Sequence, residues 1–131
     1  MKQVVSALGT RPFGVWSPAI VTDRRRLLFV SGLTARDDEG NVMAVDDVGA
    51  QTQRVCELLQ KTVEEVGATL ADVVAVTVYV RNMDDFDIIH DVRRRFFPTE
   101  PPTSSMVEVS RLVDSRSLIE ISAIAALPTD H

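Results

Sequence analysis

Residues 101–120 read PPTSSMVEVSRLVDSRSLIE, and this stretch decides the fold because it predicts two short strands joined by a connection. The first strand is expected over Ser104–Ser110 and the second over Leu118–Ala126. Side chains alternate in direction along a strand, which gives the second strand one unbroken apolar face, made of Ile119, Ile121, Ala123 and Ala125. Glu120 lies on the opposite face, so it is either turned to solvent or held in a site.

The middle of the chain predicts two helices with a strand between them. Apolar residues recur at three- and four-residue spacing between Val48 and Val66, which indicates a helix of about twenty residues, capped by Asp46 or Asp47 and ended by Gly67. Val73–Val80 is apolar on both faces and β-branched, as expected of a central strand. A second helix follows Asn82–Asp85, and its buried face is expected to consist of Phe86, Ile89, Val92 and Phe96.

The N-terminal third predicts short strands and turns. Val4–Leu8 is a candidate edge strand, followed by a turn at Gly9–Pro12, and Phe13–Val21 is expected to be irregular because Pro18 cannot lie in a central strand. Leu27–Ser31 is a compact apolar strand. A turn over Asp37–Asn41 then leads to a short returning strand, Val42–Val45.

This order of elements predicts a single domain over residues 1–131 with an α+β fold, in which two helices pack on one face of a mixed sheet. The other face is left partly apolar and without a covering layer. A sheet of this kind is typically completed by association, so we expect an oligomer, most simply a cyclic one.

Composition restricts the functional class. The net charge of −5 and the pI near 4.9 argue against broad nucleic-acid binding, which depends on neutralising phosphates. No apolar run is long enough for a membrane span, the N-terminus does not resemble a signal peptide, and the single cysteine, Cys56, fits a reducing compartment; the cytoplasm is therefore expected. Cys56 is expected to pack in the core.

Two basic triplets depart from the acidic composition, Arg24–Arg26 and Arg93–Arg95. Charge runs are usually a solvated turn or the polar face of a helix. A local anion site is the alternative.

The spacing of the polar residues along the chain matches few known patterns of catalytic or ligand-binding residues. Two histidines and one cysteine match no metal-ligand pattern, so neither a metal nor another cofactor is implied. His90 is, by itself, most simply a partly exposed structural residue. Trp16 is either core or the wall of a pocket. Gly32, after the strand Leu27–Ser31, suggests close approach of the backbone to a ligand or a neighbouring chain.

Three segments together resemble the Rid (YjgF-like) family of reactive-intermediate deaminases. They are VSGL after a strand, LADVVAVTVYVRNMDDF, and SSMVEV followed by IEISAIA, within a match over roughly residues 13–126. The resemblance implies a chorismate-mutase-like domain with a six-stranded mixed sheet and two helices on one side. It also implies a homotrimer with ligand sites in the clefts between protomers.

The deaminase branch of this family hydrolyses unstable 2-enamine or 2-imine acids to 2-keto acids and ammonia. The resemblance implies that Trp16 is the aromatic residue that lines the pocket and that Gly32 contributes its backbone amide to the site. It places His90 where the family has an asparagine, and it implies that Glu120 positions the attacking water. The candidate catalytic residues are thus Glu120 and His90, and the substrate-binding candidates are Trp16, Gly32, Ser104, Ser105 and Arg111.

One position departs from the family. Where the resemblance implies an arginine that pairs the substrate carboxylate, this chain has Ser104. A guanidinium offers two aimed hydrogen bonds and a hydroxyl offers one neutral donor. Unless another arginine reaches in, either Arg111 or one from a neighbouring protomer, a neutral or larger substrate is expected. The leading hypothesis is hydrolysis or tautomerisation of a small imine or enamine; the alternative is a trimer that binds a metabolite without catalysis.

Overall fold

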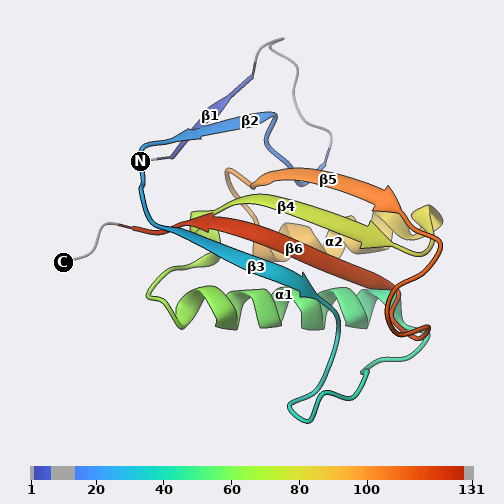
Figure 1. Ribbon diagram of the computed structural model, residues 1–131. Helices are drawn as coiled ribbons and strands as arrows, with labels where there is room; N and C mark the ends of the chain where they lie inside the picture. The colour runs from blue at the N-terminus through green and yellow to red at the C-terminus, as the bar shows by residue number, and fades with distance from the viewer. Residues whose placement is uncertain (1, 7–13, 129–131) are drawn as a thin grey trace.

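The computed structural model describes residues 2–6 and 14–128, with strands β1 to β6, helices α1 and α2 and two short 3-10 helices, η1 and η2. The strands are β1 Lys2–Val5, β2 Ala19–Thr22, β3 Leu27–Leu33, β4 Val73–Val80, β5 Thr103–Glu108 and β6 Ile119–Ala126. The helices are α1 Val48–Glu64, η1 Leu70–Asp72, η2 Met83–Asp85 and α2 Phe86–Phe96. Figure 1 shows α1 and α2 on one face of the sheet, which confirms the α+β class.

The main sheet has four strands in the order β3-β6-β4-β5. It is mixed, because β4 and β5 run parallel while β6 is antiparallel to both β3 and β4. The predicted central strand Val73–Val80 is confirmed residue for residue, and β6 lies beside it as an equally buried neighbour.

The pairing register fixes which side chains face the helices. Val76, Val78 and Val80 are buried beneath the helices, and their partners across the ladder point to the same side. The other side of the sheet, here called the open face, carries Tyr79 and its partner Glu120. Leu27, Phe29 and Val107 are exposed large apolar side chains on the open face, and Phe29 is 70% exposed.

Helix α1 begins as the sequence predicts. The Asp47 side chain accepts a hydrogen bond of 2.9 Å from the Ala50 amide, and Gly67 follows the helix with φ of +77°, a conformation that glycine adopts without strain. The helix is shorter than expected, at 17 residues. Cys56 packs fully buried on its inner face, as predicted.

The expected strands at the N-terminal side differ from the structure in three places. The six strands are divided between the main sheet and a separate two-stranded sheet, β1-β2, which Figure 1 shows apart from it. Residues 42–45 form no strand; Val42 makes only an isolated bridge to Arg36. Residues 19–22 were expected to be irregular, but they form β2. Proline is excluded from central strands only, and β2 follows Pro18 in a sheet of two strands, where every strand is an edge strand.

The predicted edge strand is confirmed only in part, since β1 ends at Val5 and residues 7 and 8 lie outside the described residues, as does the predicted turn at 9–12. No helix among residues 2–6 and 14–128 is long and apolar enough to cross a bilayer.

Candidate functional site

A hollow of about 440 Å³ on the open face contains Glu120. Its other lining residues are Tyr79, Val109, Arg111, Leu112 and Val113. Glu120 is partly buried, whereas Arg111 and Val113 are exposed, and Val113 is 98% exposed. The carboxylate predicted from the strand pattern therefore lies in a hollow and is flanked by a phenol and a cation.

Gly32 lies directly under the Glu120 side chain. A Cβ atom built on Gly32 would come within 2.2 Å of Glu120 Oε2 and 2.5 Å of its Cδ, far inside van der Waals contact. Only glycine leaves room for the carboxylate at this point. The sequence predicted that the backbone at Gly32 approaches a ligand or a neighbouring chain; in the structure the group that it approaches is the side chain of Glu120, on the neighbouring strand of the same chain.

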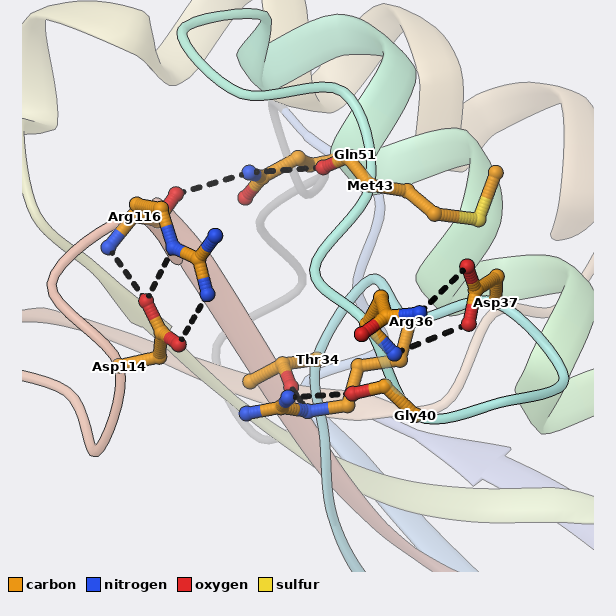
Figure 2. A network of polar contacts seen from close by, with 9 residues as sticks. Thr34, Arg36, Asp37, Gly40, Met43, Gln51, Asp114 and Arg116 are labelled. Atoms are coloured by element: carbon orange, nitrogen blue, oxygen red, sulfur yellow. Dashed lines mark hydrogen bonds and ion pairs between the residues drawn. The ribbon is translucent and has the colours of Figure 1, made fainter.

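The loop between β5 and β6, which carries Arg111, is held by the buried side chain of Gln51 on α1. Gln51 Nε2 donates to the Arg116 carbonyl at 2.9 Å, and Gln51 Oε1 accepts from the Leu118 amide at 2.7 Å. Figure 2 shows Gln51 reaching from α1 towards Arg116, which in turn pairs with Asp114. The Arg116 guanidinium holds the pKa of the Asp114 carboxyl well below its ordinary value. These contacts fix the end of the loop next to Glu120.

A second hollow of about 150 Å³ lies on the helix side of the sheet, between α2 and β5. Its lining residues are Trp16, Phe86, His90, Arg93, Ser104 and Met106. The segment with Trp16 is tied to the chain before β5, since the Ser17 amide donates to the Pro102 carbonyl at 3.0 Å. Trp16 is therefore a pocket wall, one of the two roles that the sequence left open.

His90 is buried, at 5% exposure, contrary to the expectation of a partly exposed residue. Its ring stacks on Phe86 with centroids 3.8 Å apart, and among residues 2–6 and 14–128 neither ring nitrogen has a hydrogen-bond partner. Burial, and then the neighbouring Arg93 cation, lower the pKa of His90. The imidazole is therefore neutral near pH 7, with one nitrogen able to donate and the other to accept.

Arg93 is 1% exposed, which shows that the solvated-helix interpretation of the second basic triplet is wrong for its first member. Arg93 Nη2 donates to Ser104 Oγ at 2.9 Å and to the Val15 carbonyl at 3.2 Å, while Nε has no partner among the described residues. Arg94, by contrast, is exposed and pairs with Asp91.

The sequence-predicted residues thus fall into two groups. Trp16, His90 and Ser104 lie together in the helix-side hollow, and Gly32, Arg111 and Glu120 lie together on the open face. Within one chain the two groups are not brought together. Ser105 lines neither hollow; it is an exposed open-face residue paired with Thr77.

Sequence reasoning did not single out Tyr79, and it considered Arg93 only within the triplet Arg93–Arg95, with a local anion site as the alternative to a solvated helix face. Arg93 lies seven residues after Phe86 and three after His90, the spacing of one helix face, and this was the available signal. Within residues 2–6 and 14–128, no cluster of three or more histidine, cysteine or carboxylate side chains is arranged to hold a metal ion.

Comparisons with known proteins agree on the class. The model of the family described as Endoribonuclease L-PSP matches residues 8–127. A RutC family protein of Pyrococcus abyssi is 39% identical over 115 residues, 88% of each chain.

Solved structures give the same answer. A protein of unknown function of the Rid family from Yersinia pestis superposes with a TM-score of 0.87 at 30% identity, covering 96% of this chain and 98% of its own. A YjgF family member from Mycobacterium tuberculosis superposes with a TM-score of 0.68 at 28% identity, covering 97% and 100%. The chain belongs to the Endoribonuclease L-PSP family, which includes the YjgF and Rid proteins.

Proposed function

We propose that the protein is a cytoplasmic homotrimer that hydrolyses a small imine or enamine in the clefts between its protomers. The observation that carries this proposal is the position of Glu120, whose carboxylate lies over the backbone of Gly32 at the wall of an accessible hollow. Family membership supports the class of reaction, and the buried thiol of Cys56 is compatible with a reducing compartment.

The chemistry requires a positioned water and a route for protons. Water adds to the carbon of the C=N bond, the nitrogen takes up protons, and ammonia leaves a ketone behind. Glu120 is suited to orient the water and accept its proton, because a carboxylate within hydrogen-bond reach is an efficient general base. His90 is suited to the imine nitrogen, since its neutral ring offers a donor and an acceptor that have no hydrogen-bond partner in the part of the chain that the structure describes.

A composite site between protomers would bring these groups together. Glu120 lies on the open face and His90 lies on the helix side, so within one chain the two groups line different hollows. A site that contains both groups would need Glu120 from one protomer and His90 from another. In a cyclic assembly, the β5 edge of one protomer would meet the open face of the next. The exposed Phe29 and Val107 on that face support such a contact.

The second candidate is a trimer that binds a small metabolite without turnover. It is favoured by Ser104, which stands where the resemblance implies an arginine. Nucleic acid is not proposed as the substrate, because the net charge is −5. Cleavage of RNA by the wild-type protein that disappears in Glu120→Gln would contradict this choice.

The test is turnover of freshly generated 2-aminoacrylate-type imines, followed as keto-acid and ammonia release. The proposal expects Glu120→Gln to abolish turnover while leaving ligand affinity within a few-fold of wild type. Absence of turnover in the wild-type trimer, with ligand binding retained, would instead establish the binding protein.

A further inference from the structure

Arg93 is a buried cation without a counter-charge. Its side chain is almost fully buried, and its recorded hydrogen bonds go to a neutral carbonyl and a neutral hydroxyl, those of Val15 and Ser104. Among the described residues it forms no ion pair. A guanidinium in this situation still carries unused donors, and its Nε–H is one of them.

The titratable neighbours do not supply the missing negative charge. Burial raises the pKa of the Cys56 thiol to about 12, so this group is neutral. His90 is neutral because burial and Arg93 lower its pKa. The pKa of Arg93 itself is lowered by burial to about 10, which leaves it protonated at neutral pH. Burying an unpaired charge is strongly unfavourable, and an anion in the hollow would relieve that cost.

The hollow beside Arg93 fits a small ligand with one negative charge. It measures about 150 Å³, and apart from Arg93, His90 and Ser104 its walls are Trp16, Phe86 and Met106. Aromatic and thioether walls favour a flat or apolar ligand body, whereas a guanidinium fork matches the geometry of a carboxylate.

We propose that Arg93 binds the carboxylate of a small unsaturated monocarboxylic acid in the helix-side hollow. The cation is supplied from α2, and Ser104 accepts one of its hydrogen bonds and orients the fork. This proposal rests on the proposed function for the reaction that the bound acid undergoes. Binding of the carboxylate by Arg93 is independent of that reaction. It replaces the expectation of a neutral substrate, which followed from Ser104 alone.

Trp16 offers a local readout, because it is the single tryptophan of the chain and lines this hollow. Its indole N–H resonance is followed by NMR during titration with 2-oxobutyrate and, separately, with the neutral amide 2-oxobutanamide. The variants are Arg93→Met and Arg93→Gln, and the matched control is Arg94→Met, one residue away on the solvent side.

The wild-type protein and Arg94→Met should bind 2-oxobutyrate equally well and the amide far more weakly. Either Arg93 variant that folds should bind the acid about 10- to 100-fold more weakly, the range expected for a lost charged hydrogen bond. Equal affinity of a folded Arg93 variant and wild type, equal affinity for acid and amide, or no binding of 2-oxobutyrate by the wild type would overturn the proposal.

The same titration separates this inference from the proposed reaction. Glu120→Gln should retain the affinity for 2-oxobutyrate, since glutamine keeps the size of the side chain and Glu120 is proposed to act on the water and not on the ligand carboxylate. Binding through Arg93 without any imine turnover would refute the proposed function alone. Turnover with binding unaffected by Arg93 substitution would refute the role of Arg93 alone.

Discussion

Ser104 and Glu120 point to opposite faces of the same four-stranded sheet. Ser104 pairs with Val76 and Glu120 pairs with Tyr79, and these two partners are three residues apart on β4, so their side chains point in opposite directions. Candidate residues that the sequence assigned to one cleft therefore occupy two hollows. This relationship is the reason that a complete site is proposed to require two chains.

Gly32→Ala should reduce turnover while leaving the fold nearly intact. The added methyl group would collide with the carboxylate end of Glu120, a flexible side chain that can move away. Misplacement of a catalytic group by about 1 Å can lower the rate on the order of 100-fold. Steady-state kinetics and urea unfolding measure the two effects. Unchanged turnover in a folded Gly32→Ala protein would mean that the position of the Glu120 carboxylate does not depend on the glycine.

Ser104→Arg should destabilise the protein by about 1–3 kcal/mol, because it adds a second guanidinium to a small hollow without a carboxylate. The double variant Arg93→Met/Ser104→Arg again has a single guanidinium in this hollow, now at position 104 in place of position 93. It should be more stable than Ser104→Arg and should bind 2-oxobutyrate more tightly than Arg93→Met. Urea unfolding and the Trp16 titration test this exchange; a Ser104→Arg protein as stable as wild type would contradict it.

Gln51→Leu should cost about 1–3 kcal/mol of unfolding free energy, since it leaves the partly buried Leu118 amide without its partner. The end of the β5–β6 loop would be released from α1. Gln53→Leu is the control on the same helix, because Gln53 makes only a 3.3 Å contact with Glu57. Equal stability of the two variants, with equal amide exchange at Leu118, would show that Gln51 does not hold the loop.

Acidification should destabilise the protein through His90. Its pKa is lowered in the folded state, by burial first and then by Arg93, with smaller opposing effects of the Phe86 backbone and Asp87 and a further lowering by Arg94. The unfolded chain therefore binds the proton more tightly, and stability present above pH 6.5 is lost as the pH falls through the folded-state pKa. Urea unfolding between pH 5 and 8 should show a smaller loss in His90→Gln than in wild type. Parallel curves would refute this assignment.

The fold could be predicted largely from local patterns. The apolar period of α1, the apolar β-branched run of β4 and the alternating faces of β6 are properties of short segments, and each predicted the correct element, although β4 is covered by helices on one face only (Figure 1). The separate β1-β2 sheet and the loss of the expected strand at 42–45 depend on pairing between distant segments. Local pattern contains little of that information.

The site could be predicted only in part, for a physical reason. The strand pattern singled out Glu120 and Gly32 as candidates, because a carboxylate on a strand and a glycine after one are visible in it, and the structure brings these two residues together. It did not predict that Arg93 is buried, because charge runs are normally solvated. Burial of Arg93 depends on the Val15 carbonyl, which is distant in the sequence.

The most direct test of the central claim, that each site combines groups from two protomers, is complementation between two inactive variants. Glu120→Gln and His90→Ala are each purified, shown to be inactive on the imine, and then unfolded and refolded together. Random assortment in a cyclic trimer would leave about a quarter of the interfaces with both groups intact. If each site uses two protomers, the refolded mixture should recover about that share of wild-type turnover. Mixed trimers, verified by native mass spectrometry, that remain inactive would contradict a site shared between two protomers.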